Sequence, residues 1–276
     1  MKLAKFTYFV LFVFYSMSSF AEKSFFKDIS NLLPDQKPRL SYGVAVTDFD
    51  NDGSDEFIVT GFGYENLALG YDGNSLKNKI KENIFSDFNR STIGVAACDI
   101  DKDGHEEIYF LNTDTYSGQK MYSDRLLKLV DKNIEDLFEK DINQDELNLT
   151  AGRSVVCVDR EGKGNYGIYV ANYGGPTRFY EYIEDRVVDL AESLKLDEIT
   201  GGRAVVAGHI ISDQMDIFAA NERGPNFLYY NKEGKFLDVA GQMNVRDIYQ
   251  NGRGTALSDI LYRGRLDILC LLYTSP

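Results

Sequence analysis

The sequence is poor in the residues on which most enzyme and cofactor chemistry depends. Its 276 residues include three cysteines, two histidines and no tryptophan. Both histidines, His105 and His209, fall in expected turns, and no serine or cysteine stands in a nucleophile motif such as G-x-S-x-G. Quinone-type propeller dehydrogenases stack their cofactor on tryptophan, so they are excluded as well. Paired acids could hydrolyse glycosides, but the pairs here are explained by repeated acidic loops of the cation-binding type. We therefore predict no catalytic residue, no organic cofactor and no enzymatic activity.

Cysteine is too scarce to build a disulfide scaffold. Cys98, Cys157 and Cys270 are few and odd in number. Cys98 lies one residue before a loop aspartate and Cys157 lies two residues before Asp159, and these offsets face opposite sides of a strand. A bridge between Cys98 and Cys157 is therefore not favoured, and the state of the three cysteines stays open.

Basic charge is also in short supply. Thirty lysines and arginines face 43 acidic residues, which gives a formal net charge of −13. A surface of this sign repels nucleic acid and attracts cations. We therefore expect no nucleic-acid partner.

The N-terminus has the pattern of a secretory signal peptide. Lys2 and Lys5 precede an apolar run over residues 6–15, and Ser19-Phe20-Ala21 provides small residues three and one before a cut at Glu22. The run is shorter than the roughly 20 residues that span a bilayer, which disfavours an anchor. We predict a signal peptide at residues 1–21 and a secreted, extracellular chain from residue 22, without a membrane span.

The most informative stretch is residues 94–112, where two apolar runs enclose alternating acids. Asp99, Asp101 and Asp103 stand at every second position, Gly104 permits a positive φ, and Glu107 closes the loop. Calcium takes about six to eight oxygen ligands, which such a loop supplies. An EF-hand has a glutamate at its twelfth loop position and helices on both sides. Here the twelfth residue is Phe110 and both flanks resemble strands, so we predict a cation site between two β-strands.

This pattern recurs along the chain. The first loop positions are Asp48, Asp99, Asp159, His209 and Asp259, separated by 51, 60, 50 and 50 residues. Between these copies, segments of alternating polarity predict further strands at Asn66–Asp72, Arg125–Asn133, Arg178–Asp185 and Asn226–Gly234. Periods of this length with several short strands predict an all-β fold made of four-stranded propeller blades.

A second repeated feature is an apolar-Asp-apolar step. It follows three of these strands, at Asp136, Asp189 and Asp238, and occurs once more at Asp28, before the first loop. A strand over residues 25–33 would then complete the last blade of a closed ring. Because the fifth unit stops after its first hairpin, we interpret residues 22–276 as a propeller domain that is incomplete at its C-terminus. The alternative is a genuine short form.

Several long motifs resemble one protein family. YGVAVTDFDNDG, GVAACDIDKDGHEEIYFLNT and NERGPNFLYYNKEGKFLDVA are similar to the cartilage acidic protein family, which carries FG-GAP and VCBS repeats. The resemblance covers about residues 25–268. It implies a secreted, glycosylated, calcium-binding propeller of the extracellular matrix with seven blades, of which about four and a part are present here. It further implies an extracellular protein or matrix partner of unknown identity.

Two loops have complete ligand sets, which predicts about two structural Ca2+ ions. The first site comprises Asp48, Asp50, Asp52, Glu56 and the carbonyl of Ser54. The second comprises Asp99, Asp101, Asp103, Glu107 and the carbonyl of His105. In the third loop Lys163 replaces an acid, so an internal ion pair or a plain turn is expected beside Asp159, with metal binding there open. The fourth and fifth loops are not expected to bind metal.

Binding remains as the expected function. Sequons at Asn89 and Asn148 predict surface glycans. We predict an extracellular protein-interaction module with a matrix or cell-surface receptor partner. The alternative is a carbohydrate-binding propeller that uses exposed Tyr116 and Tyr173, and a hydrolase is less favoured. Fold analogy does not name the partner.

Overall fold

The computed structural model describes residues 26–33 and 38–273. The chain divides into two units, residues 1–31 and 32–276. The predicted signal peptide lies outside the described residues. No helix within the described ranges is long and apolar enough to cross a bilayer.

The described residues of the second unit form four antiparallel sheets of four strands each. Within each sheet the strands follow chain order, but the third and fourth sheets are joined into one eight-stranded sheet by pairing between the second strand of the third and the first strand of the fourth. The first sheet comprises β1 (Val44–Thr47), β2 (Glu56–Val59), β3 (Leu67–Tyr71) and β4 (Leu76–Asn78). The second comprises β5 (Thr92–Cys98), β6 (Glu107–Asn112), β7 (Arg125–Val130) and β8 (Asn133–Asp136). The third comprises β9 (Gly152–Val158), β10 (Gly167–Pro176), β11 (Arg178–Ile183) and β12 (Arg186–Asp189). The fourth comprises β13 (Ile199–Gly208), β14 (Asp216–Asn221), β15 (Phe227–Lys232) and β16 (Lys235–Asp238).

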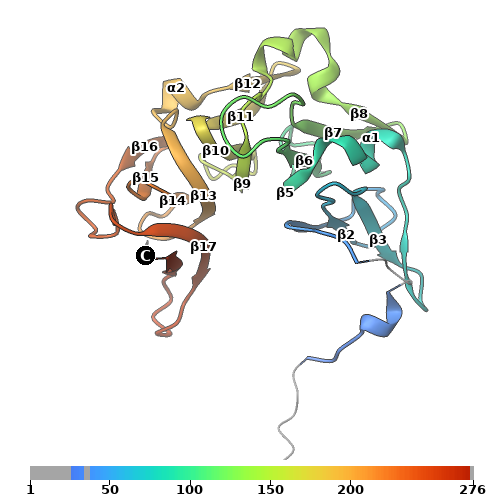
Figure 1. Ribbon diagram of the computed structural model, residues 1–276, viewed down its shortest axis with the longest axis horizontal. Coiled ribbons are helices and arrows are strands. Elements are labelled where there is room, and N and C mark those ends of the chain that lie inside the picture. The colour runs from blue at the N-terminus through green and yellow to red at the C-terminus, as the bar shows by residue number, and fades with distance from the viewer. Residues whose placement is uncertain (1–25, 34–37, 274–276) are drawn as a thin grey trace, which may run out of the picture. The chain divides into compact units, whose positions relative to one another are not determined.

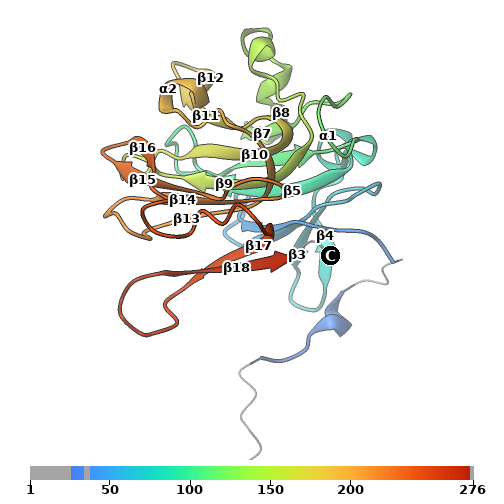
Figure 2. The same cartoon turned by 60° about the vertical axis from the view of Figure 1, so that its left-hand side comes forward.

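A hairpin of β17 (Asn251–Ser258) and β18 (Asp267–Tyr273) follows the fourth sheet (Figure 2). Over residues 26–33 and 38–273, helical structure is confined to short turns: α1 (Asn83–Ser86), α2 (Ala191–Leu194), and the 3-10 turns η1 (Ser30–Leu32), η2 (Phe88–Arg90), η3 (Leu137–Glu139) and η4 (Asp141–Glu146). The predicted all-β repeat, including its third strands, is therefore confirmed.

Consecutive sheets pack against one another through the first strand of each sheet, which we call the inner strand. β1 contacts β5, β5 contacts β9, β9 contacts β13, and β13 contacts β17, so the sheets follow chain order as the colours of Figure 1 show. Side chains of a strand alternate between its two faces. Accordingly, Phe110 of β6 packs with the first sheet and Tyr109 packs with the third. A blade between two others must be apolar on both faces, which is why all six residues of β6 are buried.

The apolar-Asp-apolar step ends the hairpin of the third and fourth strands in the second, third and fourth sheets. Asp136 Oδ1 accepts hydrogen bonds from the backbone N–H of Leu126 (3.1 Å) and of Phe138 (3.0 Å). Asp189 accepts in the same way from Phe179 and Ala191, and Asp238 accepts from Leu228 and Ala240. One carboxylate thus ties the third strand to the turn that leaves the fourth.

The copy of this step at Asp28 does not form the predicted strand. Among described residues 26–33 there is only the 3-10 turn η1, although Asp28 Oδ1 accepts from Ser30 N–H (2.8 Å) as the other steps do. The local turn forms because it needs only neighbouring residues. A strand also needs hydrogen bonds to a second strand, which the local sequence does not supply.

The expectation about the cysteines was wrong, because Cys98 and Cys157 form a disulfide with a Cα–Cα distance of 6.3 Å. Cys98 ends β5 and Cys157 lies in β9, so the bond joins the inner strands of the second and third sheets. Adjacent blades stack with opposite faces in contact. A disulfide between equivalent strands of adjacent blades therefore joins residues on opposite strand faces. Cys98 and Cys157 lie on opposite faces in this way, although the sequence-based prediction took that difference as evidence against a bond between them. Cys270 is free.

Candidate cation sites

In the first, second, third and fifth loops, the first aspartate accepts backbone hydrogen bonds that shape the turn. Asp48 accepts hydrogen bonds from the backbone N–H groups of Asp52 (3.0 Å) and Gly53 (2.9 Å). Equivalent pairs of bonds reach Asp99, Asp159 and Asp259 from the residues four and five positions later. Gly53 and Gly104 adopt φ of 87° and 89°, as the turn requires. Because the third and fifth loops do the same, these bonds shape a turn and do not by themselves indicate metal.

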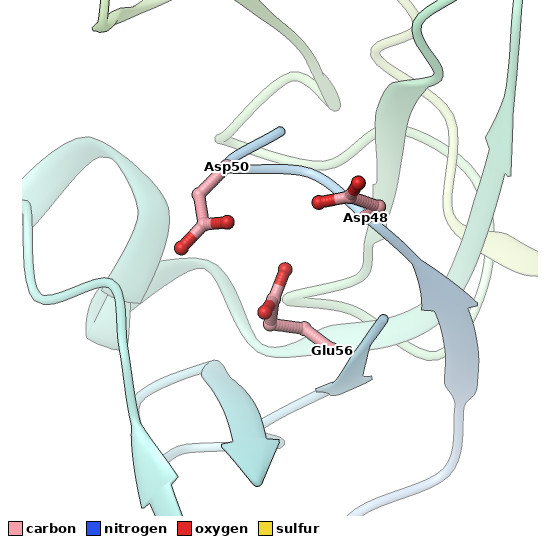
Figure 3. A group of neighbouring side chains, drawn as sticks. All are labelled: Asp48, Asp50 and Glu56. Atoms are coloured by element: carbon pink, nitrogen blue, oxygen red, sulfur yellow. The ribbon is translucent and has the colours of Figure 1, made fainter. Parts of the chain in front are cut away.

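The first loop adds a cluster of converging acids. Asp48, Asp50 and Glu56 each offer a carboxylate oxygen, and the three atoms lie within 4.8 Å of one another. Figure 3 shows Asp48 and Asp50 on the loop directed toward Glu56, which begins β2. Glu56 is fully buried, and neither of its oxygens has a hydrogen-bond partner among the described residues. Burial, followed by the charges of Asp50 and Asp52, raises the pKa of Glu56 to about 7.

A buried carboxylate without a donor is costly, since each unpaired buried polar group costs about 1–3 kcal/mol and a charged one more. A bound cation would offset that cost. The donor set consists of oxygens only, as hard cations such as Ca2+ prefer. The residues of the first loop therefore fit a calcium ion.

The second loop has the same acids but contains an internal cation. Asp99, Asp101 and Glu107 form a cluster within the same 4.8 Å limit. The Lys128 ammonium group, from β7, contacts Asp101 and lies 2.7 Å from Asp103 and 2.9 Å from Glu107. Burial raises the pKa of Glu107 to about 7. Asp101 Oδ1 is buried without a partner, so the site fits a cation but holds a competing lysine that the sequence reasoning missed.

The residue of the third strand that lies opposite the closing acid, Lys128 in the second sheet, differs between the sheets. Gly70 of β3 occupies this position in the first sheet, and Lys79 reaches only Asp52 there, at 3.2 Å. A Cβ at Gly70 would lie 3.2 Å from Glu56 Oε1. The residue on the third strand that faces the closing glutamate can be identified once the strand pairing is known. Its distance along the sequence from that glutamate differs between repeats. That is why the loop motif alone did not reveal Lys128.

The remaining predicted ligands are less central. The side chains of Asp52 and Asp103 are each 41% exposed and pair with Lys79 and Lys128. Their Oδ1 atoms also accept from the N–H groups of Ser54 and His105. The carbonyls of Ser54 and His105 stay predicted ligands.

Internal partners occupy the acids of the other three loops. Lys163 pairs with Glu161 at 2.7 Å in the third loop, as the ion-pair interpretation expected. Asp216 accepts from the N–H groups of Ile211, Ser212 and Asn231 in the fourth. Arg263 pairs with Asp267 at 2.5 Å in the fifth.

One of the two predicted glycan sites is contradicted. Asn89 is exposed, and its glycosylation stays a prediction. Asn148 is fully buried, and its Nδ2 donates to Asp124 (2.6 Å) and to Asn172 (3.0 Å). The glycan would attach to this nitrogen, so the fold leaves no room for it. The sequon instead belongs to a buried network in which Asp124 also pairs with Lys120.

Comparison with known proteins agrees with this architecture. The FG-GAP-like repeat family matches residues 26–110. Cartilage acidic protein 1 of Xenopus tropicalis is 42% identical over 86% of this chain, and that of Homo sapiens is 41% identical over 93%. The chain is a homologue of cartilage acidic protein 1. Its successive four-stranded sheets and its FG-GAP-like repeat make it an all-β protein of the propeller type, as the repeat predicted.

This homologue matches only part of its relatives. It spans 41% of the Xenopus protein and 43% of the human one. Among solved structures, the Vibrio cholerae biofilm matrix protein Bap1 gives a TM-score of 0.48 at 15% identity, over 84% of this chain and 35% of that one.

Proposed function

We propose that this chain is an extracellular, calcium-stabilised propeller module that binds a protein or matrix partner. The observation that carries the proposal is the pair of oxygen-only clusters at Asp48 and Asp99, each built into the turn of an inner hairpin and each with a buried, unpaired carboxylate oxygen. Structural disulfides are typical of oxidising compartments, so the Cys98–Cys157 bond supports secretion. The acidic composition suits the name of its relatives.

In this proposal calcium stabilises and does not catalyse. Each ion would link the end of one strand to the beginning of the next, through Asp48, Asp50 and Glu56 in the first sheet and through Asp99, Asp101 and Glu107 in the second. Binding to the native state alone raises stability by RT ln(1 + [L]/Kd), about 2.7 kcal/mol at a hundredfold excess over Kd. The outer loops would then present a fixed surface to the partner.

Native mass spectrometry and thermal melting test the calcium sites. We expect two ions per chain, and chelation should lower the melting temperature. Glu56→Gln should abolish one ion and Asp101→Ala should weaken the other, whereas the exposed control Glu192→Gln should retain both. A count of no ions or of more than three, or a melt unchanged by chelator, would contradict the proposal.

The partner requires a separate test. Immobilised chain with calcium, compared with chain in chelator and with Glu56→Gln, should retain a defined component of a cartilage matrix extract only when calcium is bound. Equal retention in all three would show that calcium does not organise the binding surface.

A further inference from the structure

A second type of site lies at the opposite end of the inner strands. Tyr42, Ile93, Arg153, Arg203 and Arg253 occupy one equivalent position in the five repeats, six residues before the first loop position. All five line one hollow of about 680 Å3, together with Ser91, Thr113, Asp114, Thr115, Tyr116 and Phe62. Six residues of strand extend about 20 Å, so this hollow is distant from the cation clusters.

Arginine and tyrosine are interleaved in this hollow. The guanidinium carbon of Arg153 lies 5.2 Å from the ring centre of Tyr116 and 5.3 Å from that of Tyr173. Arg203 lies 5.7 Å and 5.4 Å from the same two rings. Tyr116 is 60% exposed, whereas Tyr173 is only 7% exposed. The two tyrosines predicted as carbohydrate contacts therefore lie together, but only Tyr116 is free to meet a ligand.

The hollow has more positive than negative charge. Glu222 accepts from Arg203 (2.5 Å) and from Arg253 (2.9 Å), so one carboxylate serves two guanidinium groups. Asp114 is occupied by the backbone N–H groups of Met121 and Tyr122. Within the described ranges no carboxylate lies in ion-pair distance of Arg153, which donates instead to Thr113 Oγ1 (3.2 Å) and to two carbonyls. Burial and the nearby charge of Arg203 lower the pKa of Arg153.

Three guanidinium groups, of which only Arg203 and Arg253 pair with a carboxylate of the described residues, that of Glu222, form a cationic patch in a chain of net charge −13. Guanidinium groups bind carboxylate and sulfate oxygens through paired N–H donors. The hydroxyls of Ser91, Thr113 and Thr115 add further hydrogen-bonding groups, and the exposed ring of Tyr116 offers an apolar face. The volume lies within the usual range of small-ligand sites.

We propose that this hollow binds an acidic saccharide, through a sulfate or carboxylate group held by Arg153 and Arg203 and a sugar ring packed on Tyr116. Arg253 and Glu222 position Arg203 in this arrangement. The site is independent of the calcium sites, so it extends the carbohydrate-binding alternative and does not rest on the calcium proposal.

Calorimetry with a heparin-derived sulfated disaccharide tests the proposal, with a glucuronate-containing disaccharide and uncharged cellobiose as comparisons. We expect saturable binding of the acidic sugars only, weakened by added salt. Arg153→Gln and Arg203→Gln should each reduce affinity roughly tenfold or more, as loss of a charged hydrogen-bonding group does. Tyr116→Ala should weaken the saccharides but not inorganic sulfate. The exposed control Arg186→Gln should bind normally.

A variant that does not fold is covered by a measurement on the unaltered protein. The sulfated disaccharide should shift the NMR signals of the Nε–H groups of Arg153 and Arg203 to saturation and leave that of Arg186 in place. Three results would overturn the proposal: no binding, equal affinity for inorganic sulfate and the sulfated disaccharide, or tighter binding of a glutamate-rich peptide than of any saccharide. Binding that persists in chelator would support it whether or not calcium binds.

Discussion

Removal of the Cys98–Cys157 disulfide should destabilise the protein substantially. The bond closes a loop across a sequence separation of 59 residues between two sheets. In the chain-entropy treatment, a loop of this length contributes about 4 kcal/mol at 25 °C, because the unfolded chain loses the conformations that the cross-link forbids. For a domain of this size, such a loss corresponds to a fall of roughly 10 °C in melting temperature.

The assay is urea unfolding of the Cys98→Ser, Cys157→Ser double variant beside the unaltered protein, with and without reductant. Cys270→Ser is the matched control, because Cys270 is free. Reductant should destabilise the unaltered protein and the control, but not the double variant. Free thiols at Cys98 and Cys157 in peptide mapping, or a stability change below about 1 kcal/mol, would refute the reasoning.

Three further predictions concern the cation loops and the sheet faces. Lys128→Met should raise the calcium affinity of the second site in calorimetry, because it removes the competing ammonium group, while the exposed control Lys132→Met should not; equal affinities would show that Lys128 does not compete. With calcium chelated, folded-state pKa values of about 7 for Glu56 and Glu107, against 4.5 ordinarily, mean that stability from these groups is present below pH 4.5 and lost as the pH rises through 7. Urea unfolding between pH 5 and pH 8 should show this loss, and saturating calcium should reverse it; a chelated protein more stable at pH 8 would contradict the sign. Finally, the apolar residues Val44 and Val46 of β1 and Leu269 and Leu271 of β18 are 42–62% exposed, so the chain should self-associate in light scattering, and a stable monomer with a sharp melt would contradict this.

The repeat and the turns could be predicted from the sequence alone. The intervals between first loop positions, the alternating segments and the apolar-Asp-apolar steps all describe interactions between residues close in the chain. The same bonds recur at Asp48, Asp99, Asp159 and Asp259 because each loop folds on its own aspartate. Interactions between residues close in the chain form in the same way in each repeat. The strands and both acidic clusters could therefore be predicted.

Contacts between residues of different sheets depend on how the sheets stack, which the sequence pattern does not show. Cys98 and Cys157 are joined because stacked blades bring opposite faces together, and Asn148 is buried because a network of the second and third sheets closes over its amide. Lys128 enters the second loop from a strand whose distance along the sequence varies between repeats. Arg153, Arg203 and Arg253 each look like an ordinary surface arginine in sequence. They become a single cationic hollow because the inner strands of successive blades bring one equivalent position together at one end.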